Sequence, residues 1–246
     1  MNIFTETGDY ILLMSRVFNR PQKAPIFWKQ MFQEIQNLGI QSIGIVAIIS
    51  VFMGAVVAIQ TAYNIDSPLI PLSMVGFTTR QSVILEFSPT VISLILAGKV
   101  GSRIASEIGT MRVTEQIDAL EIMGVNSANH LILPKVVASV LFNPVLIVFS
   151  MGLGILGGWL AMTLSGLVST HDFIAGTRVD FEVFVVIYAL IKTVFFAFII
   201  STISGFYGYI TKGGALEVGQ ASTKAVVYSS ILIILFNLVL TQILLT

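Results

Sequence analysis

The chain has 246 residues, of which 55% are hydrophobic and only 11% are charged, and its mean hydropathy is +0.92. This composition is far from that of soluble globular domains and is typical of a protein embedded in a bilayer. The formal net charge is zero, which gives no electrostatic basis for a nucleic-acid partner, and the absence of cysteine excludes disulfides and thiolate metal sites. We therefore expect an all-α integral membrane protein.

Residues 1–39 form an amphipathic region rather than a cleavable signal peptide, because Glu6 and Asp9 interrupt any basic leader. Apolar residues recur at helical spacing in YILLMSRVF and in PIFWKQMFQEIQNLG, and Gly39 is placed to end the second helix. We expect these helices to lie in the cytoplasmic membrane interface. The alternative is that they are soluble amphipathic helices packed on another subunit.

Residues 40–246 form a predicted five-span domain, because they hold five apolar stretches long enough to cross a hydrocarbon core, which takes about 20 residues. The predicted spans are Ile40–Ala62, Val83–Ile104, Leu131–Ser165, Phe181–Ile210 and Val226–Leu245. Proline lacks an N–H and clashes with the preceding helical turn. Pro89 therefore predicts a distortion in the second span, and Pro144 predicts a kink in the third.

The distribution of basic residues predicts the orientation of these spans. With the N-terminus inside, the inside segments hold ten basic residues and the outside segments hold two, Arg80 and Arg178. The ten are Arg16, Arg20, Lys23, Lys29, Lys99, Arg103, Arg112, Lys135, Lys212 and Lys224. This asymmetry predicts a cytoplasmic N-terminus and, after five spans, a C-terminus on the opposite side.

The stretch AGKVGSRIASEIGTM, residues 97–111, brings charge into the inner end of the second span. A helix there would have ridges at i, i+4 spacing. Two ridges are small, one formed by Ala97, Gly101, Ala105 and Gly109 and the other beginning at Gly98, and a third carries Lys99, Arg103 and Glu107. The small ridges predict close helix packing. The charged ridge predicts a water-filled cavity or a charge network in which Arg103 and Glu107 pair, with snorkelling as the alternative for Lys99.

The next stretch, RVTEQIDALEIMGV, is too short and too charged to cross a membrane. Thr114 is expected to be the N-cap of a short helix, Glu115 and Asp118 suit its positive end, and Gly124 is expected to follow its last turn. Its apolar stripe consists of Val113, Ile117, Leu120 and Met123. Such a helix either packs back onto its own bundle or inserts into a cytoplasmic partner.

Lys192 lies eleven residues into the fourth predicted span, which places it near the middle of the bilayer. A lysine at that depth indicates a functional path or a buried pair. Two interpretations remain open. Lys192 lines a cavity and faces a lipid phosphate, or it forms a structural pair with an acidic neighbour such as Glu86 or Glu107.

The sequence lacks the common catalytic motifs. A P-loop requires G-x-x-x-x-G-K-[ST], but Gly98-Lys99 is followed by Val100, and Ser93 stands where the first glycine belongs. There is no HExxH, histidine cluster or G-x-S-x-G either. We expect no catalytic residue and no metal site, so any ATPase must be a separate subunit. An ion-coupled secondary transporter of a small or lipophilic substrate is the alternative class, although no internal repeat supports it.

The run AGKVGSRIASEIGTMRVTEQIDALEIMGV resembles the signature of the MlaE/YrbE-type permeases, the membrane subunits of ABC lipid-transport systems that work with Mce-domain proteins. A looser similarity covers the whole chain, including LPKVVASVLFNPVL and GILGGWL. The resemblance implies that residues 40–246 are the permease domain of a homodimer in the inner membrane, with a periplasmic C-terminus. It also implies that two copies enclose a cavity for phospholipid, and that ATP and magnesium are bound by a P-loop ATPase subunit rather than by this chain.

The same resemblance implies roles for individual residues. The helix at about 114–123 would be the coupling helix that docks on the ATPase, with Thr114, Glu115, Ile117, Asp118, Leu120, Glu121 and Met123. The lipid cavity or charge network would include Lys99, Arg103, Glu107 and Lys192, and helix packing would use Gly98, Gly101, Ala105 and Gly109. The implied function is movement of phospholipid between the inner membrane and an Mce-domain protein, which contributes to outer-membrane lipid asymmetry.

Overall fold

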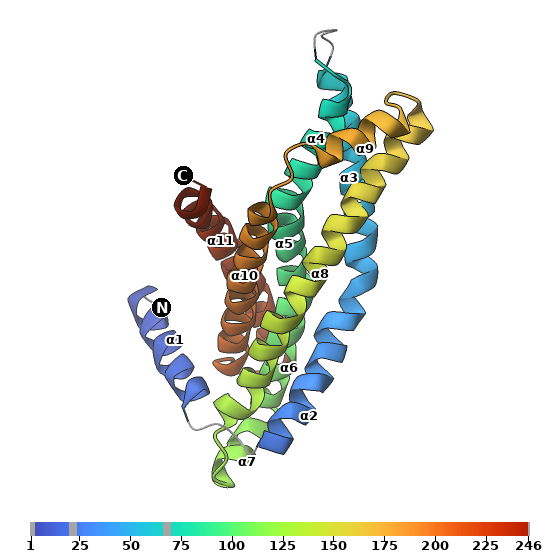
Figure 1. Cartoon of the computed structure of the whole chain (residues 1–246). Helices are drawn as coiled ribbons and strands as arrows, with labels where there is room; N and C mark the ends of the chain where they lie inside the picture. Colours follow the sequence, from blue (N-terminus) through green and yellow to red (C-terminus); the bar gives the residue numbers. More distant parts are fainter. Residues whose placement is uncertain (1–2, 20–23, 66–69, 246) are drawn as a thin grey trace. The chain divides into compact units, whose positions relative to one another are not determined.

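The structure is a computed structural model that describes residues 3–19, 24–65 and 70–245 (Figure 1). Within these ranges the regular elements are all helices. Five helical stretches are long and apolar enough to cross a membrane, namely Ala24–Asn64, Ser73–Val113, Ser127–Ser165, Val183–Tyr209 and Ala215–Leu244. The predicted all-α fold with five spans is confirmed. Arg20 and Lys23, two of the basic residues that predicted the orientation, lie outside the described residues.

The first two spans are each assembled from several consecutive helical segments. The first consists of α2 (Ala24–Glu34), η1 (Ile35–Gly39), η2 (Ile40–Ser42) and α3 (Ile43–Asn64). The second consists of α4 (Ser73–Ser82), η3 (Val83–Val91), α5 (Ile92–Leu96), η4 (Ala97–Gly101) and α6 (Ser102–Val113). Here η1, η3 and η4 are π-helical, and η2 is a 3-10 turn.

The other helices are more regular. They are α1 (Ile3–Phe18), α7 (Gln116–Ile122), α8 (Ser127–Ser165), α9 (Thr170–Arg178), α10 (Val183–Tyr209) and α11 (Ala215–Leu245). The distortion predicted at Pro89 takes the form of the π-helical segment η3. By contrast, α8 stays α-helical through Pro144, so that proline does not interrupt the helix.

The expectation that Gly39 ends the second N-terminal helix is wrong, because the chain remains helical from Ala24 to Asn64. The π-helical turn η1 ends at Gly39 and passes directly into η2. A Cβ on Gly39 would lie 2.2 Å from the ring of Phe142. Gly39 therefore allows a close approach of two helices rather than a helix end.

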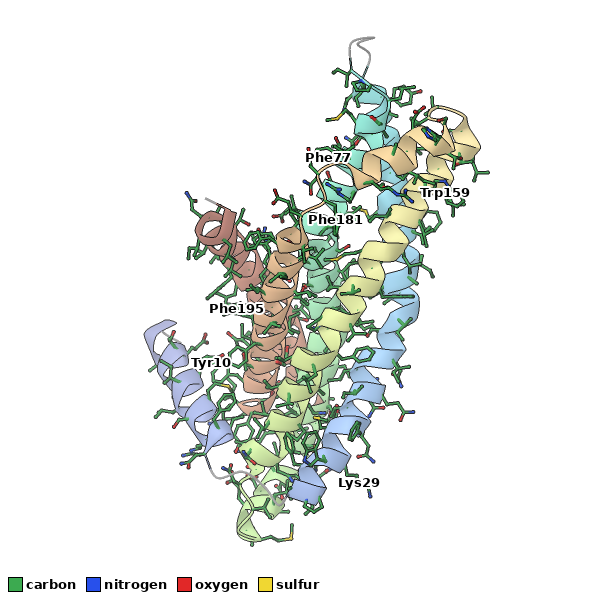
Figure 2. The ribbon with its side chains drawn as sticks, in the orientation of Figure 1. Tyr10, Lys29, Phe77, Trp159, Phe181 and Phe195 are labelled. Atoms are coloured by element: carbon green, nitrogen blue, oxygen red, sulfur yellow. The ribbon has the colours of Figure 1, made fainter. Side chains whose placement is uncertain are left out.

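The chain forms two compact units, each assembled from separate stretches of sequence. Unit 1 comprises Met1–Gln41, Leu94–Phe142 and Phe195–Val239, and unit 2 comprises Ser42–Ser93, Asn143–Val194 and Leu240–Thr246. Within unit 1, α1 packs on α10 through aromatic side chains. The hydroxyl of Tyr10, which Figure 2 labels, donates to Thr202 Oγ1 at 2.9 Å, and Phe18 stacks on Phe198. The N-terminal amphipathic helix thus has a binding face within its own chain.

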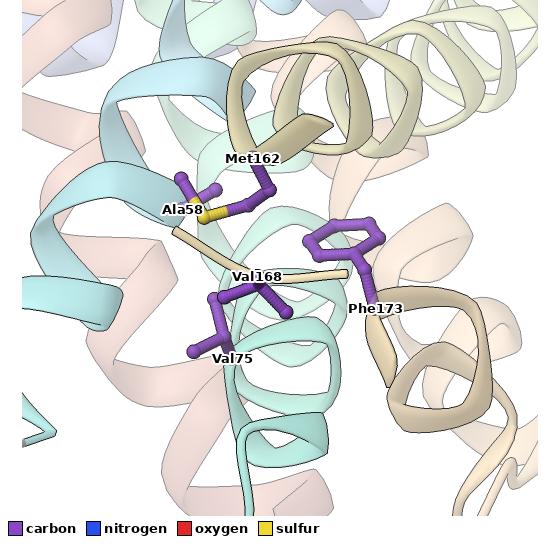
Figure 3. Close-up of a cluster of buried hydrophobic side chains, with 5 residues drawn as sticks. All are labelled: Ala58, Val75, Met162, Val168 and Phe173. Carbon is purple, nitrogen blue, oxygen red and sulfur yellow. The ribbon is translucent and has the colours of Figure 1, made fainter. Parts of the chain in front are cut away.

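Within unit 2, a cluster of buried apolar side chains joins α3, α4, α8 and α9 (Figure 3). It consists of Ala58, Val75, Met162, Val168 and Phe173. The short helix α9 begins after Ser169, whose hydroxyl accepts a hydrogen bond from the Asp172 N–H, as expected of an N-cap. This cluster fixes the two short helices α4 and α9 against each other.

A second anchor of unit 2 is Arg80, whose side chain is buried although the sequence placed it among the outside residues. Its guanidinium donates hydrogen bonds to the carbonyl oxygens of Thr177 (3.0 Å), Val179 (2.8 Å) and Asp180 (3.3 Å). The rings of Phe77 and Phe181 lie 5.1 and 5.6 Å from it (Figure 2). A planar group with five donors suits this role, because it binds several carbonyls of one turn at once.

Glycines let α3 and α8 approach closely in unit 2. A Cβ on Gly54 would lie 1.8 Å from the Gly154 carbonyl oxygen, and one on Gly157 would lie 2.1 Å from the Val51 carbonyl oxygen. Both obstacles are backbone atoms, so a side chain at either position would push the helices apart. Small residues at such crossings provide the packing that the hydrophobic effect cannot supply within lipid.

We therefore predict that Gly157→Ala lowers the free energy of unfolding by about 1–3 kcal/mol, the usual cost of overpacking. Gly152→Ala in the same helix is the matched control, because a Cβ at Gly152 would have nothing within 4 Å of it. It should leave stability unchanged or raise it slightly, since alanine favours helix over glycine. Equilibrium unfolding in mixed micelles measures both variants, and equal stabilities would contradict the close crossing.

Candidate functional site

The small ridge of the second span packs inside unit 1. A Cβ on Gly101 would lie 2.9 Å from Ser204 Oγ, and one on Gly109 would lie 3.3 Å from a methyl carbon of Val218. Ala105 is also buried, and its carbonyl oxygen lies 2.8 Å from the Cβ position of Gly208. Gly98 differs, because its Cβ position faces open space. The structure therefore places three of the four predicted packing residues against α10 and α11.

Two of the three charged residues on the next ridge bind backbone carbonyls. Lys99 donates to the carbonyl oxygen of Gln41, and Arg103 Nη1 donates to the carbonyl oxygen of Asn37 at 3.0 Å. Both carbonyls belong to the stretch of η1 and η2, where the α-helical hydrogen-bond pattern is broken. Arg103 also donates to the side-chain oxygen of Gln41 at 2.5 Å. The basic ridge thus holds the irregular part of the first span.

Glu107 takes a different partner from the one expected. The predicted pair was Arg103–Glu107, but the ion pair that the structure gives Glu107 within the described residues is with Lys135, at 2.8 Å. The same ammonium lies 2.6 Å from a carboxylate oxygen of Glu34. Lys135 is only 3% exposed, while Glu34 and Glu107 are 15% and 45% exposed. One buried lysine therefore joins α2, α6 and α8.

An open groove of about 520 Å³ follows this face of α6. It is lined by Arg103, Ser106, Glu107, Thr110 and Met111. Two opposite charges stand one helical turn apart in it, with two hydroxyls and a thioether beside them. The groove is shallow and open, and its side chains suit a ligand that carries both charges.

Lys192 is fully buried in unit 2 and has three kinds of partner there. Its ammonium lies 2.7 Å from Glu86 Oε1, 4.6 Å from the centre of the Tyr188 ring and 3.4 Å from the Leu85 carbonyl oxygen. Pro89, one turn later, cannot donate to a carbonyl of that turn because it has no N–H. Of the two interpretations of Lys192, the structure thus displays the pair with Glu86.

The short helix α7 spans Gln116–Ile122, and Thr114 is not its N-cap. Thr114 instead ends α6, where its hydroxyl donates to the Thr110 carbonyl oxygen, and Glu115 precedes α7 in a left-handed conformation with φ +61°. The reversal lies one residue later than the capping pattern indicated, because Thr114 is the C-cap of α6. Glu115, which the sequence predicted to follow the N-cap, instead forms the turn that precedes α7.

The C-terminal end of α7 is a Schellman motif centred on Gly124, which has φ +74°. The Gly124 N–H donates to the Glu121 carbonyl oxygen, and the Val125 N–H donates to the Leu120 carbonyl oxygen. Ile117 is fully buried against its own chain, whereas Ile122 and Met123 are 87% and 68% exposed. One face of α7 therefore packs inward, and its apolar tip is uncovered.

Sequence reasoning missed Glu34 and Lys135 as members of the charge network. Lys135 was counted only as an inside-facing basic residue, although it follows a proline within the apolar run LILPKVVASV. A lysine inside an apolar helix requires a nearby carboxylate. The position of Lys135 in an apolar helix thus indicated a carboxylate partner. The tertiary structure determines that Glu34 and Glu107 are the partners.

Together the five apolar helices and the buried ion pairs define a multi-pass membrane protein. The model of the family described as Permease MlaE matches residues 31–243. The chain belongs to the MlaE permease family, whose related proteins include ABC transporter permeases.

Three relatives illustrate the range of this family. A Rickettsia bellii protein named "Probable ABC transporter permease protein" is 36% identical over 89% of this chain and 85% of its own length. The Haemophilus influenzae protein named "Intermembrane phospholipid transport system permease protein MlaE" is 30% identical over 94% of this chain and 88% of its own length. The Arabidopsis thaliana protein named "TRIGALACTOSYLDIACYLGLYCEROL 1, chloroplastic" is 31% identical over 94% of this chain and 66% of its own length.

We predict that Lys135→Met lowers the free energy of unfolding by about 3–5 kcal/mol, because it leaves the carboxylate of Glu34 without its counter-charge. Glu107→Gln is the matched variant at the exposed end of the network, and it should cost less because Glu34 still binds Lys135. Unfolding in mixed micelles compares the two. Equal losses would show that Lys135 is not the centre of the network.

We predict that Lys192→Met lowers the free energy of unfolding by about 1.5–3 kcal/mol, the contribution of a hydrogen bond to a charged group. Lys224→Met replaces an exposed lysine on α11 and should leave stability unchanged. If Lys192→Met keeps its stability but loses lipid transport, the interpretation of Lys192 as a residue that faces a lipid phosphate is correct instead.

Proposed function

We propose that this chain is the permease subunit of an ABC-type phospholipid transporter in the inner membrane. It moves phospholipid between that membrane and an Mce-domain protein, contributes to outer-membrane lipid asymmetry, and works as two identical copies with a separate P-loop ATPase. Membership of the MlaE permease family supports this proposal, as does the name of the Haemophilus influenzae relative.

The distribution of basic residues between the two units supports a cytoplasmic N-terminus and a periplasmic C-terminus. Of the described basic residues, eight belong to unit 1 and three to unit 2. The eight are Arg16, Lys29, Lys99, Arg103, Arg112, Lys135, Lys212 and Lys224, and the three are Arg80, Arg178 and Lys192. The larger number of basic residues in unit 1 supports its assignment to the cytoplasmic side. The N-terminal segment belongs to unit 1 and the C-terminal segment to unit 2.

The observation that carries the proposal is the uncovered tip of α7. Ile122 and Met123 expose large aliphatic side chains on a helix whose other face is anchored by Ile117. Exposed apolar residues on an anchored helix of the cytoplasmic unit are typical of a protein interface. In our proposal this tip inserts into the ATPase subunit, so α7 is the coupling helix. The predicted stripe then divides, with Ile117 buried against its own chain, Leu120 half-buried and Met123 facing the partner.

The groove on α6 is the proposed binding site for the lipid headgroup. Arg103 offers a positive charge to a phosphate, and Glu107 offers a negative charge to an ammonium group one turn away. Lys99 and Lys192 have a supporting role in this proposal, because each ammonium group binds a carbonyl of an irregular helix within its own unit. The lipid then passes through the cavity between the two permease copies.

Transport in this proposal depends on movement rather than on covalent chemistry. ATP and magnesium are bound by the ATPase subunits, and their closure moves the two docked copies of α7. That displacement narrows the cavity between the permease copies and drives the lipid to or from the Mce-domain protein. This chain contributes the docking helix, the headgroup groove and the walls of the cavity.

Native mass spectrometry of the complex extracted gently from its own host tests this function. We predict two copies of this chain with two copies of a P-loop ATPase, an Mce-domain oligomer and bound phospholipid. Ile122→Glu should remain in the membrane but lose the ATPase, because a charge replaces the exposed apolar tip.

Leu164→Glu is the matched control, because Leu164 is 85% exposed but belongs to unit 2. It should keep the ATPase. Recovery of the wild-type chain without any ATP-binding partner would contradict the function. If Ile122→Glu still recovers the ATPase normally, the assignment of α7 as the coupling helix is wrong, but the proposed function is not contradicted.

A further inference from the structure

Tyr209, the last residue of α10, is in contact with residues of three other helices in unit 1. Its hydroxyl donates to Glu121 Oε1 on α7 at 2.8 Å and lies 2.8 Å from the hydroxyl of Ser127, the first residue of α8. Its ring lies 5.9 Å from the guanidinium carbon of Arg112 on α6. The side chain of Tyr209 thus contacts a residue that precedes α7, Arg112, and a residue that follows it, Ser127.

The hydroxyl groups of this cluster are arranged around a single carboxylate. Ser127 Oγ lies 2.9 Å from the same Oε1 atom of Glu121 that accepts from Tyr209. Each hydroxyl has one proton to donate, whereas an ionised carboxylate only accepts. The hydrogen bonds from Tyr209 and Ser127 accordingly lower the pKa of Glu121, so the carboxylate is charged at neutral pH.

Arg112 completes the cluster with an ion pair to the first turn of α7. Its Nη1 lies 2.5 Å from Asp118 Oδ1, one turn before Glu121. The first turn of α7 is therefore joined to α6, and the last turn is joined to α8 and α10. The buried Ile117 and the tight turns at Glu115 and Gly124 also connect α7 to its neighbours.

We propose that Tyr209, Glu121 and Ser127 form a mechanical link that carries the displacement of α7 to α8 and α10. This inference rests on the proposed function, because it requires a partner that moves α7. A push on the exposed tip at Ile122 acts one residue from Glu121. The carboxylate then pulls on the two hydroxyls, so the cytoplasmic ends of two candidate membrane spans move together with α7.

The chemistry of the link fits transmission better than fold stability. Glu121 is exposed, and a charged hydrogen bond at an exposed site contributes little to the free energy of unfolding because water replaces it at low cost. A hydrogen bond is nevertheless directional and short, so it fixes the distance between two helices in a way that an apolar contact does not. These residues are positioning residues and touch neither lipid nor ATP in this proposal.

Tyr209→Phe tests the link, because it removes the hydroxyl and keeps the ring beside Arg112. The assembled complex, with its ATPase and Mce-domain partner, is reconstituted in vesicles of phosphatidylethanolamine and phosphatidylglycerol. The measured quantity is the amount of fluorescent phosphatidylethanolamine transferred per ATP hydrolysed. We predict a loss of about two- to fivefold in this ratio, the effect of a charged hydrogen bond at an exposed site, with ATP hydrolysis and ATPase co-purification retained.

Tyr10→Phe is the matched control, because it removes a tyrosine hydroxyl that also bonds to α10 but does not touch α7. It should leave the ratio unchanged. Glu121→Ala should reduce the ratio as Tyr209→Phe does, and the double variant should be no worse than either single variant, because both changes break the same link. Glu121→Ala also serves if Tyr209→Phe does not fold, since Glu121 is exposed.

The outcomes separate the two proposals. If the wild-type complex transfers no phospholipid with ATP, the proposed function is wrong and the link has nothing to transmit. If the wild type transfers phospholipid and both link variants keep the wild-type ratio, the link alone is wrong. If the link variants lose the ATPase during purification, the cluster belongs to the docking surface and the proposal of transmission is overturned.

Discussion

Backbone polar groups within a hydrocarbon core must find partners inside the protein, because no water is available there. This chain departs from the α-helical pattern at η1, η2, η3 and η4, where carbonyl oxygens no longer pair with the N–H four residues later. Basic side chains occupy several of these positions. Lys99 and Arg103 bind carbonyls around η1 and η2, and Lys192 approaches the Leu85 carbonyl in η3. The unusual charges of this membrane protein thus stabilise its irregular helices.

The need for partners inside the protein also separates two groups of charged residues, which differ in their exposure. Lys135 and Lys192 are buried and have carboxylate partners, so they join helices. Arg103 and Glu107 have partners but remain partly exposed along an open groove. Only the second group is accessible to a ligand. The buried Lys135 holds the Glu107 carboxylate in place, and such support from a buried neighbour is common in binding sites.

The sequence predicted the features that depend on local chemistry. Length and hydropathy predicted five helical spans, Pro89 predicted the distortion of the second, and Gly124 predicted the end of α7. Prediction from the sequence failed where tertiary contacts determine the role of a residue. Gly39 looked like a helix stop but allows the approach of Phe142, and Thr114 looked like an N-cap but bonds back to α6. The partners of Lys135 lie 101 and 28 residues away, a distance that helical periodicity does not reach.

The buried guanidinium of Arg80 has a consequence for biogenesis. Its carbonyl partners lie 97 to 100 residues later in the chain, and Lys192, the partner of Glu86, lies 106 residues after Glu86. At about 5–20 residues per second, the ribosome makes those partners roughly 5–20 s after Arg80 and Glu86 themselves. During that time the guanidinium of Arg80 and the carboxylate of Glu86 lack these distant partners, although Thr90 of the same span donates to Glu86 Oε2 at 3.0 Å. The ion pair between the second span and Lys192 can therefore form only after α10 has been made.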